Sequence, residues 1–173
     1  MPKNVEIKAR ARNFEHQQSL ASMLCDCSGE KIDQRDTFYE VPRGRLKLRE
    51  FSDGSGELIY YLRADTLQAK QSDYQLSSVD APASLKAVLS AALQQVGEVC
   101  KERYLYLCGS TRIHFDRVHG LGEFIELEVV MQSGQPQSAG EKIVADLMRQ
   151  LEIAEADLIR GAYVDLLNPL CTD

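Results

Sequence analysis

Apolar and charged residues alternate strictly in several short stretches of the chain, as they do in strands that bury one face. The clearest stretch is residues 111–131, in which two alternating runs flank a turn at residues 119–122. Arg112, His114 and Asp116 share one face of the first run, and apolar residues share the other. The stretch therefore predicts a hairpin whose polar face carries a cation, an imidazole and a carboxylate.

The second run of this hairpin places Glu126 and Glu128 together on one face. Two carboxylates that are two residues apart on a strand lie about 7 Å from each other, close enough to hold one or two hard divalent cations. The same stretch therefore predicts a candidate metal site.

The same alternation predicts further strands along the chain. They cover residues 4–11, 31–41, 45–51, 57–63, 72–79 and 99–107, which with the hairpin makes about eight strands. Helices are expected at residues 13–25 after the N-cap Asn13, from 80–82 onward, from a capping box at 138–141 onward, and briefly at 155–160 before Gly161. The tail at 163–167 is expected to pack back on the domain. Short connections between the strands indicate an α+β chain built on an antiparallel barrel or a strongly curved sheet.

Length and composition indicate a globular domain in the cytosol. A chain of 173 residues without a long linker or a tandem repeat suits one domain over residues 1–173. No apolar run is long enough to span a membrane, and residues 1–10 show no signal-peptide pattern. The odd number of cysteines and their spacing favour free thiols in a reducing compartment, the cytoplasm. A net charge of -6 argues against general nucleic-acid binding.

Charged residues at alternate strand positions usually face water, and for any single strand this remains the commoner explanation. The rows considered together favour another arrangement, because each alternates with apolar residues that must face helices or core. These rows are Glu6, Lys8 and Arg10; Arg45, Lys47 and Arg49; Lys101 and Arg103; and Arg112, His114 and Asp116. If the sheet closes, all of them point into one lumen. Such a lumen is costly to fold unless water or an anion occupies it.

Carboxylates in the same lumen indicate what the anion is. A divalent cation held by Glu6, Glu126 and Glu128 can bridge to the oxygens of a polyphosphate that arginines and lysines grip. Arginine suits this task because its planar fork meets phosphate oxygens through two hydrogen bonds. The residues therefore favour a polyphosphate-binding tunnel with Mg²⁺ or Mn²⁺ over a purely internal ion-pair network.

Three motifs resemble the CYTH, or triphosphate tunnel, family. The run NVEIK at residues 4–8 resembles the N-terminal ExExK signature, and RLKLR and ELE fall where that family places its basic and acidic strands. The run IHFDRVHGLGEFIELE is most similar to the class IV adenylyl cyclase branch. The similarity extends from Asn4 to about Leu167. It implies an eight-stranded antiparallel tunnel, dependence on a divalent metal, triphosphate substrates and a homodimer.

The chain departs from the family pattern at two positions. Asn4 replaces the first Glu of ExExK, so that a neutral amide stands where an anionic ligand is expected. Tyr61 stands where the family often has a Lys in a Thr-x-Lys setting on the fourth strand. These changes bear on the number of metal sites and on which phosphate or base is accepted.

The candidate site residues fall into three groups. The metal ligands are Glu6, Glu126 and Glu128, with Asp116 as a further ligand or as a carboxylate that supports the ligands. The triphosphate-binding residues are Lys8, Arg10, Arg45, Lys47, Arg49, Arg63, Lys101, Arg103 and Arg112. Catalysis is assigned to Lys8, Glu6, Glu126 and Glu128, with Lys8 either cradling phosphate or acting as a general base. His114 is expected to be structural or hydrogen-bonded, with contact to the substrate as the alternative.

Three functions fit these residues. The first is an adenylyl cyclase, a phosphorus–oxygen lyase that converts ATP to cyclic AMP and pyrophosphate. The second is a hydrolase of tripolyphosphate, a nucleotide or thiamine triphosphate, because the same metal and cations stabilise either transition state. The third is a catalytically impaired module that binds polyphosphate or nucleotide. The cyclase-like signature in residues 113–128 favours the first.

Overall fold

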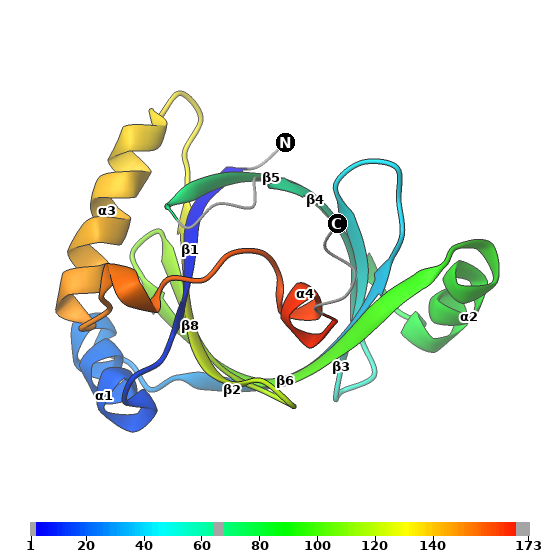
Figure 1. Cartoon of the computed structure of the whole chain (residues 1–173), viewed down its shortest axis with the longest axis horizontal. Helices are drawn as coiled ribbons and strands as arrows, with labels where there is room; N and C mark the ends of the chain where they lie inside the picture. Colours follow the sequence, from blue (N-terminus) through cyan, green and yellow to red (C-terminus); the bar gives the residue numbers. More distant parts are fainter. Residues whose placement is uncertain (1–2, 64–67, 169–173) are drawn as a thin grey trace.

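The computed structural model describes residues 3–63 and 68–168, and they form a closed antiparallel β-barrel with helices on its outside and one short helix within it (Figure 1). The strands are β1 (Lys3–Arg10), β2 (Glu30–Tyr39), β3 (Arg45–Phe51), β4 (Gly56–Arg63), β5 (Lys70–Val79), β6 (Gln95–Cys108), β7 (Thr111–Val118) and β8 (Gly122–Val130). Their order around the barrel is β1-β5-β4-β3-β2-β6-β7-β8. The predicted α+β fold with an eight-stranded antiparallel barrel is therefore confirmed.

Four helices and one short 3₁₀ turn accompany the barrel in the part of the chain that is described. They are α1 (Phe14–Cys25), α2 (Pro82–Ala92), α3 (Gln137–Gln150), η1 (Glu155–Asp157) and α4 (Tyr163–Leu167). The predicted N-cap of α1 is confirmed, because the side chain of Asn13 accepts a hydrogen bond from the backbone N–H of His16 at 3.3 Å.

Two helix boundaries differ from the expectation. The capping box at 138–141 is wrong, because α3 begins at Gln137 after the extended residue Pro136 and has no side-chain cap. The helix expected at 155–160 is only the turn η1. The residues after it are extended and add to β1, where Leu158 forms a bridge with Ala9 and Ile159 N donates to Lys8 O at 2.9 Å.

The strand register places apolar side chains on the outside of the barrel and charged side chains within it. β1 and β8 pair so that Glu6 lies opposite Glu128 and Lys8 lies opposite Glu126, all on the inner face. Val5, Ile7, Ile113, Phe115, Ile125 and Leu127 point outward and are at most 2% exposed. They form one hydrophobic core with side chains of α1 and α3, which cover this side of the barrel (Figure 1). Burial of each such side chain stabilises the fold by about 1.5–3 kcal/mol.

Helix α3 lies very close to β1 because a glycine faces the strand. A Cβ atom on Gly140 would lie 2.7 Å from Cγ2 of Val5 and 2.7 Å from Sδ of Met131. The absence of a side chain at this position therefore allows the helix to cover the outer face of β1 directly.

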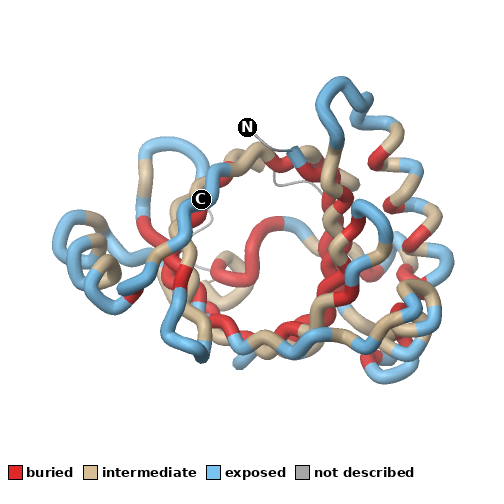
Figure 2. Tube along the Cα trace, turned by 180° about the vertical axis from the view of Figure 1, so that it is seen from behind, coloured by how far each residue is buried: buried red, intermediate tan, exposed pale blue. Residues whose placement is uncertain are grey.

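A second hydrophobic core lies inside one end of the barrel and is built around α4. The buried side chains of Tyr163 and Val164 pack there with Phe38, Val99 and Phe124, and Figure 2 shows this buried segment inside the ring of strands. Gly97 of β6 makes room for it, because a Cβ atom there would lie 2.8 Å from Cγ2 of Val164. The tail therefore packs back on the barrel by entering it.

Within residues 3–63 and 68–168, no helix has both the length and the apolar character that crossing a membrane requires. Cys25, Cys27, Cys100 and Cys108 are free thiols, and Cys171 lies outside the described residues.

Candidate active site in the barrel lumen

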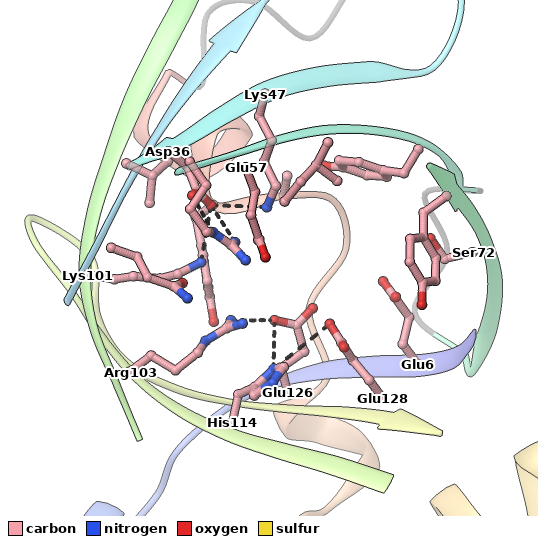
Figure 3. A pocket seen from close by; sticks show the side chains of 18 of the residues that line it. Glu6, Asp36, Lys47, Glu57, Ser72, Lys101, Arg103, His114, Glu126 and Glu128 are labelled. Atoms are coloured by element: carbon pink, nitrogen blue, oxygen red, sulfur yellow. Dashed lines mark hydrogen bonds and ion pairs between the residues drawn. The ribbon is translucent and has the colours of Figure 1, made fainter. Parts of the chain in front are cut away.

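The barrel encloses a cavity of about 350 Å³, within the size range of small-molecule sites. Most of the predicted site residues line it, and Figure 3 shows their side chains converging from several strands. The predicted residues in the lining are Glu6, Lys8, Lys47, Arg49, Arg63, Lys101, Arg103, Arg112, Glu126 and Glu128. Charged residues from alternate positions of several strands thus line one cavity.

Three predicted residues lie elsewhere. Arg10 is exposed at the end of β1, with its guanidinium carbon 5.2 Å from the centroid of the Phe124 ring. Arg45 forms an ion pair at 2.8 Å with Asp165 of α4. Asp116 is completely buried behind the lining. Among the described residues these three do not line the cavity, and their assignment to phosphate or metal remains a prediction.

Asp36 of β2 organises the cations on one wall of the cavity. Its two oxygens accept hydrogen bonds from Arg49 Nε at 2.7 Å, Lys47 Nζ at 3.0 Å and Lys101 Nζ at 3.4 Å (Figure 3). Burial by itself would raise the pKa of Asp36, but the positive charges of these three side chains hold it well below its usual value. Asp36 is therefore a carboxylate shared by three cations.

The two lysines of this cationic wall are easily deprotonated. Burial lowers the pKa of Lys47 to about 8, and the neighbouring charge of Arg49 adds to the effect. Burial lowers the pKa of Lys101 to about 7, and the charge of Arg103 lowers it further. The positive charge of this wall consequently depends on pH near neutrality.

The opposite wall carries carboxylates from β1 and β8. Glu126 lies 3.5 Å from Lys8 Nζ and accepts a hydrogen bond from Arg103 at 3.0 Å. Glu128 accepts from Arg112 at 2.9 Å. Burial would raise the pKa of Glu126, but the positive charges of Lys8 and Arg103 hold it well below its usual value.

Glu6 differs from these two carboxylates. Its oxygen accepts a hydrogen bond from Arg63 at 2.6 Å, and both side chains are only 6% exposed. Burial raises the pKa of Glu6; Arg63 opposes this rise, whereas the negative charges of Glu126 and Glu128 add to it. Glu6 is therefore paired with Arg63 and lies close to two further carboxylates, those of Glu126 and Glu128.

Asp116 and Tyr163 fix the position of Arg103. The guanidinium donates two hydrogen bonds of 2.7 Å to Asp116, and the hydroxyl of Tyr163 donates a third to the same carboxylate at 2.9 Å. The ring of Tyr163 also lies 4.1 Å from Lys8 Nζ, close enough for a cation–π contact. Helix α4 thus contributes a residue to the lining of the lumen.

Three buried side chains on the lumen face have atoms without hydrogen-bond partners among the described residues. Gln34 Oε1 lacks a donor, Arg63 Nε and Nη2 lack an acceptor, and His114 Nδ1 has no partner. His114 Nδ1 lies 3.9 Å from oxygens of both Glu126 and Glu128, beyond hydrogen-bond distance. Burial lowers the pKa of His114, and the charge of Arg103 contributes, so the neutral ring is favoured.

Asp36 and Tyr163 were not predicted from the sequence as site residues. Asp36 carried a usable signal, because Gln34, Asp36 and Phe38 alternate on one face of β2 and all line the lumen or its inner core. Tyr163 carried none, since its place depends on the path of the chain into the barrel. The two departures from the family pattern, Asn4 and Tyr61, both line the cavity.

Comparisons with known proteins agree with this fold. The family model described as the CYTH domain matches residues 2–163. The structure of the PH1012 protein from Pyrococcus horikoshii is similar with a TM-score of 0.82 at 24% identity, over 94% of this chain and 98% of that one. A Vibrio parahaemolyticus structure named "putative adenylate cyclase" is similar with a TM-score of 0.77 at 19% identity, over 95% and 97% of the two chains. No curated protein matches the sequence.

Proposed function

The chain belongs to the CYTH domain family, and from that premise we propose that it is a divalent-metal-dependent enzyme that acts on triphosphate substrates. One observation carries the proposal: cations from β3 and β6 face carboxylates from β1 and β8 across a single cavity (Figure 3). The unpartnered N–H groups of Arg63 support it, because buried donors without acceptors are costly and phosphate oxygens would satisfy them.

The residues on the carboxylate wall fit a divalent cation. Glu126 and Glu128 supply oxygen ligands next to a buried ring nitrogen of His114 that has no partner. When bound, Mg²⁺ or Mn²⁺ would neutralise phosphate oxygens and stabilise the charge that develops on the leaving group. Glu6 is the further ligand that the family resemblance implies.

The basic side chains would hold and orient the phosphates. Asp36 fixes the guanidinium of Arg49, and Asp116 fixes that of Arg103, so both forks are positioned before the substrate arrives. Each guanidinium has further N–H groups that can donate hydrogen bonds to phosphate oxygens. Lys8 lies between Glu126 and the ring of Tyr163, where it would contact phosphate or accept a proton.

Conversion of ATP to cyclic AMP and pyrophosphate, as in the class IV adenylyl cyclases, is the activity that we favour. In that reaction the ribose 3′-oxygen forms a bond to the α-phosphorus, its proton passes to a base, and the bond to pyrophosphate breaks. The observation that favours a nucleotide over bare tripolyphosphate is an aromatic part of the lining, to which Phe38, Phe51, Tyr61 and Tyr74 contribute. Such side chains can stack on a base.

Product analysis separates this activity from the alternatives. The protein is incubated with ATP or tripolyphosphate and either Mg²⁺ or Mn²⁺, and the products are resolved by chromatography. Cyclic AMP with pyrophosphate is the expected result. Orthophosphate would instead show a hydrolase of tripolyphosphate or nucleotide. Intact substrate that raises the melting temperature would show a binding module without turnover.

Binding of a polyphosphate should take up protons near neutral pH. Lys101 and Lys47 have pKa values of about 7 and about 8, and an anion raises both because it favours the charged amine. Affinity should therefore be greatest below pH 7 and should fall as the pH rises through 7 to 8. Calorimetry at pH 7.5 in two buffers of different ionisation enthalpy measures the uptake. If the wild type and Lys101→Met take up the same number of protons, Lys101 is not a source of the proton uptake on polyphosphate binding.

A further inference from the structure

The imidazole of His114 is placed as a ligand rather than as a structural group. It is on β7, and its side chain is only 5% exposed. Nδ1 has no hydrogen-bond partner among the described residues, although polar side chains surround it. A buried ring nitrogen that makes no hydrogen bond loses the interaction that it has with water, at a cost of about 1–3 kcal/mol. A structural histidine would normally avoid that cost.

The atoms nearest to this nitrogen are suitable metal ligands. Oε2 of Glu126 and Oε1 of Glu128 each lie 3.9 Å from Nδ1. Dashed lines mark these two contacts in Figure 3. In an octahedral site with bonds of about 2.1 Å, adjacent ligands are about 3 Å apart and opposite ligands about 4.2 Å apart. The three ligand atoms all lie within 4.8 Å of one another, so small side-chain movements suffice to surround one cation.

The contacts of the neighbouring carboxylates favour this set of ligands over one centred on β1. Arg63 holds Glu6 at 2.6 Å, and Asn4 provides an amide where the family motif has a carboxylate. Glu128, in contrast, contacts Arg112 through Oε2 and directs Oε1 toward the ring of His114. Glu126 is paired as well, since its Oε2 accepts a hydrogen bond from Arg103 at 3.0 Å. The hairpin β7–β8 nevertheless offers two carboxylates beside one unpartnered imidazole nitrogen, whereas β1 offers a single carboxylate held by Arg63.

We propose that His114, Glu126 and Glu128 form a three-ligand site that binds a first-row transition cation, of which Mn²⁺ is the probe, in preference to Mg²⁺. Imidazole is a good ligand for first-row cations such as Fe²⁺, and the two carboxylates of this set suit Mn²⁺, whereas the harder Mg²⁺ prefers oxygen ligands and keeps several waters. The inference rests on the proposed function in one respect, namely that the lumen holds a divalent cation. It adds that a nitrogen ligand decides which cation is held.

The nitrogen ligand can be detected directly. Mn²⁺ is added to the untagged, nucleotide-free protein, and electron spin echo envelope modulation is recorded. We expect ¹⁴N modulation from a directly bound imidazole. In His114→Gln the modulation should disappear, whereas it should persist in His119→Gln, which changes a histidine on the exposed β7–β8 turn. Bound Mn²⁺ without nitrogen modulation in the wild type would overturn the proposal without any need for a variant.

Affinities provide the second measurement. Titration calorimetry should show that His114→Gln weakens Mn²⁺ binding by at least about tenfold and Mg²⁺ binding by less than about threefold. Equal losses for the two ions would contradict the selectivity. A circular dichroism melt confirms that the variant is folded.

Neither measurement uses a substrate, so this inference and the proposed function can fail separately. Nitrogen-coupled Mn²⁺ without turnover of any triphosphate would leave the metal site standing and reject the enzyme. Turnover of ATP or tripolyphosphate with Mn²⁺ bound only by oxygen would do the reverse.

Discussion

Replacing Asp36 with Asn should lower the free energy of unfolding by about 3–5 kcal/mol, because an amide leaves Lys47, Arg49 and Lys101 buried together without their shared carboxylate. A loss of this size corresponds to a fall in melting temperature of roughly 6–20 °C for a domain of this length. The difference in unfolding free energy between the variant and the wild type should grow as the pH falls through 8 and 7, because Lys47 and Lys101 of the wild type become fully charged in this range.

Urea denaturation of both proteins at several pH values measures this effect. Asp33→Asn is the matched control, because Asp33 is on the same strand but is exposed, and its change should be within about 0.5 kcal/mol. Tripolyphosphate should restore much of the lost stability by supplying negative charge to the same cations. Equal stabilities of Asp36→Asn and the wild type would show that these cations do not depend on Asp36.

Glu126→Gln should reduce metal-dependent turnover by about 10³-fold while the protein remains folded. The amide keeps the shape of the side chain but removes the negative charge that lies beside Lys8, Arg103 and His114. A divalent cation contributes several kcal/mol of transition-state stabilisation, and each 1.4 kcal/mol or so corresponds to about a tenfold change in rate. Glu128→Gln should have an effect of the same order.

The measurement is kcat with ATP or tripolyphosphate at saturating metal, together with a thermal melt of each variant. Glu123→Gln is the control, because Glu123 is on the same strand but pairs with Arg117 on the outer face of the barrel. Wild-type turnover in both Glu126→Gln and Glu128→Gln would refute the assignment of these carboxylates to the metal.

Alternation along the strands predicted an antiparallel barrel or a strongly curved sheet, and the resemblance to the CYTH family implied that the sheet closes into an eight-stranded tunnel with these residues in its lining. In a closed sheet each side chain points either inward or outward, so the phase of the pattern determines the face of every residue. It does not determine the depth along the barrel axis. Lys47 and Arg45 have the same phase, yet Lys47 lines the cavity and Arg45 pairs with Asp165 of α4. Arg10 likewise lies beyond the cavity, at the end of β1.

Features that depend on distant parts of the chain were not predictable from local patterns. Tyr163 reaches the lumen only because residues 158–159 add to β1 and direct the chain inward, and Gly97 leaves space for the helix that follows. The start of α3 was misplaced by a capping box at Ser138, because the extended Pro136 is the N-cap and the helix already begins at Gln137. In each case a tertiary contact or a fixed backbone angle outweighed the local preference.

The pairing of β1 with β8 has a consequence for how the protein folds. These strands belong to the first and last parts of the sheet in sequence, and their contact aligns Asn4 to Arg10 with Val130 to Phe124. On its other edge β1 pairs with β5 only from Lys3 to Glu6. Contacts between segments so far apart in sequence form slowly, because a long loop must be closed first. We therefore expect the pairing of β1 with β8, which closes the ring and brings the charged inner faces together, to be a late step in folding.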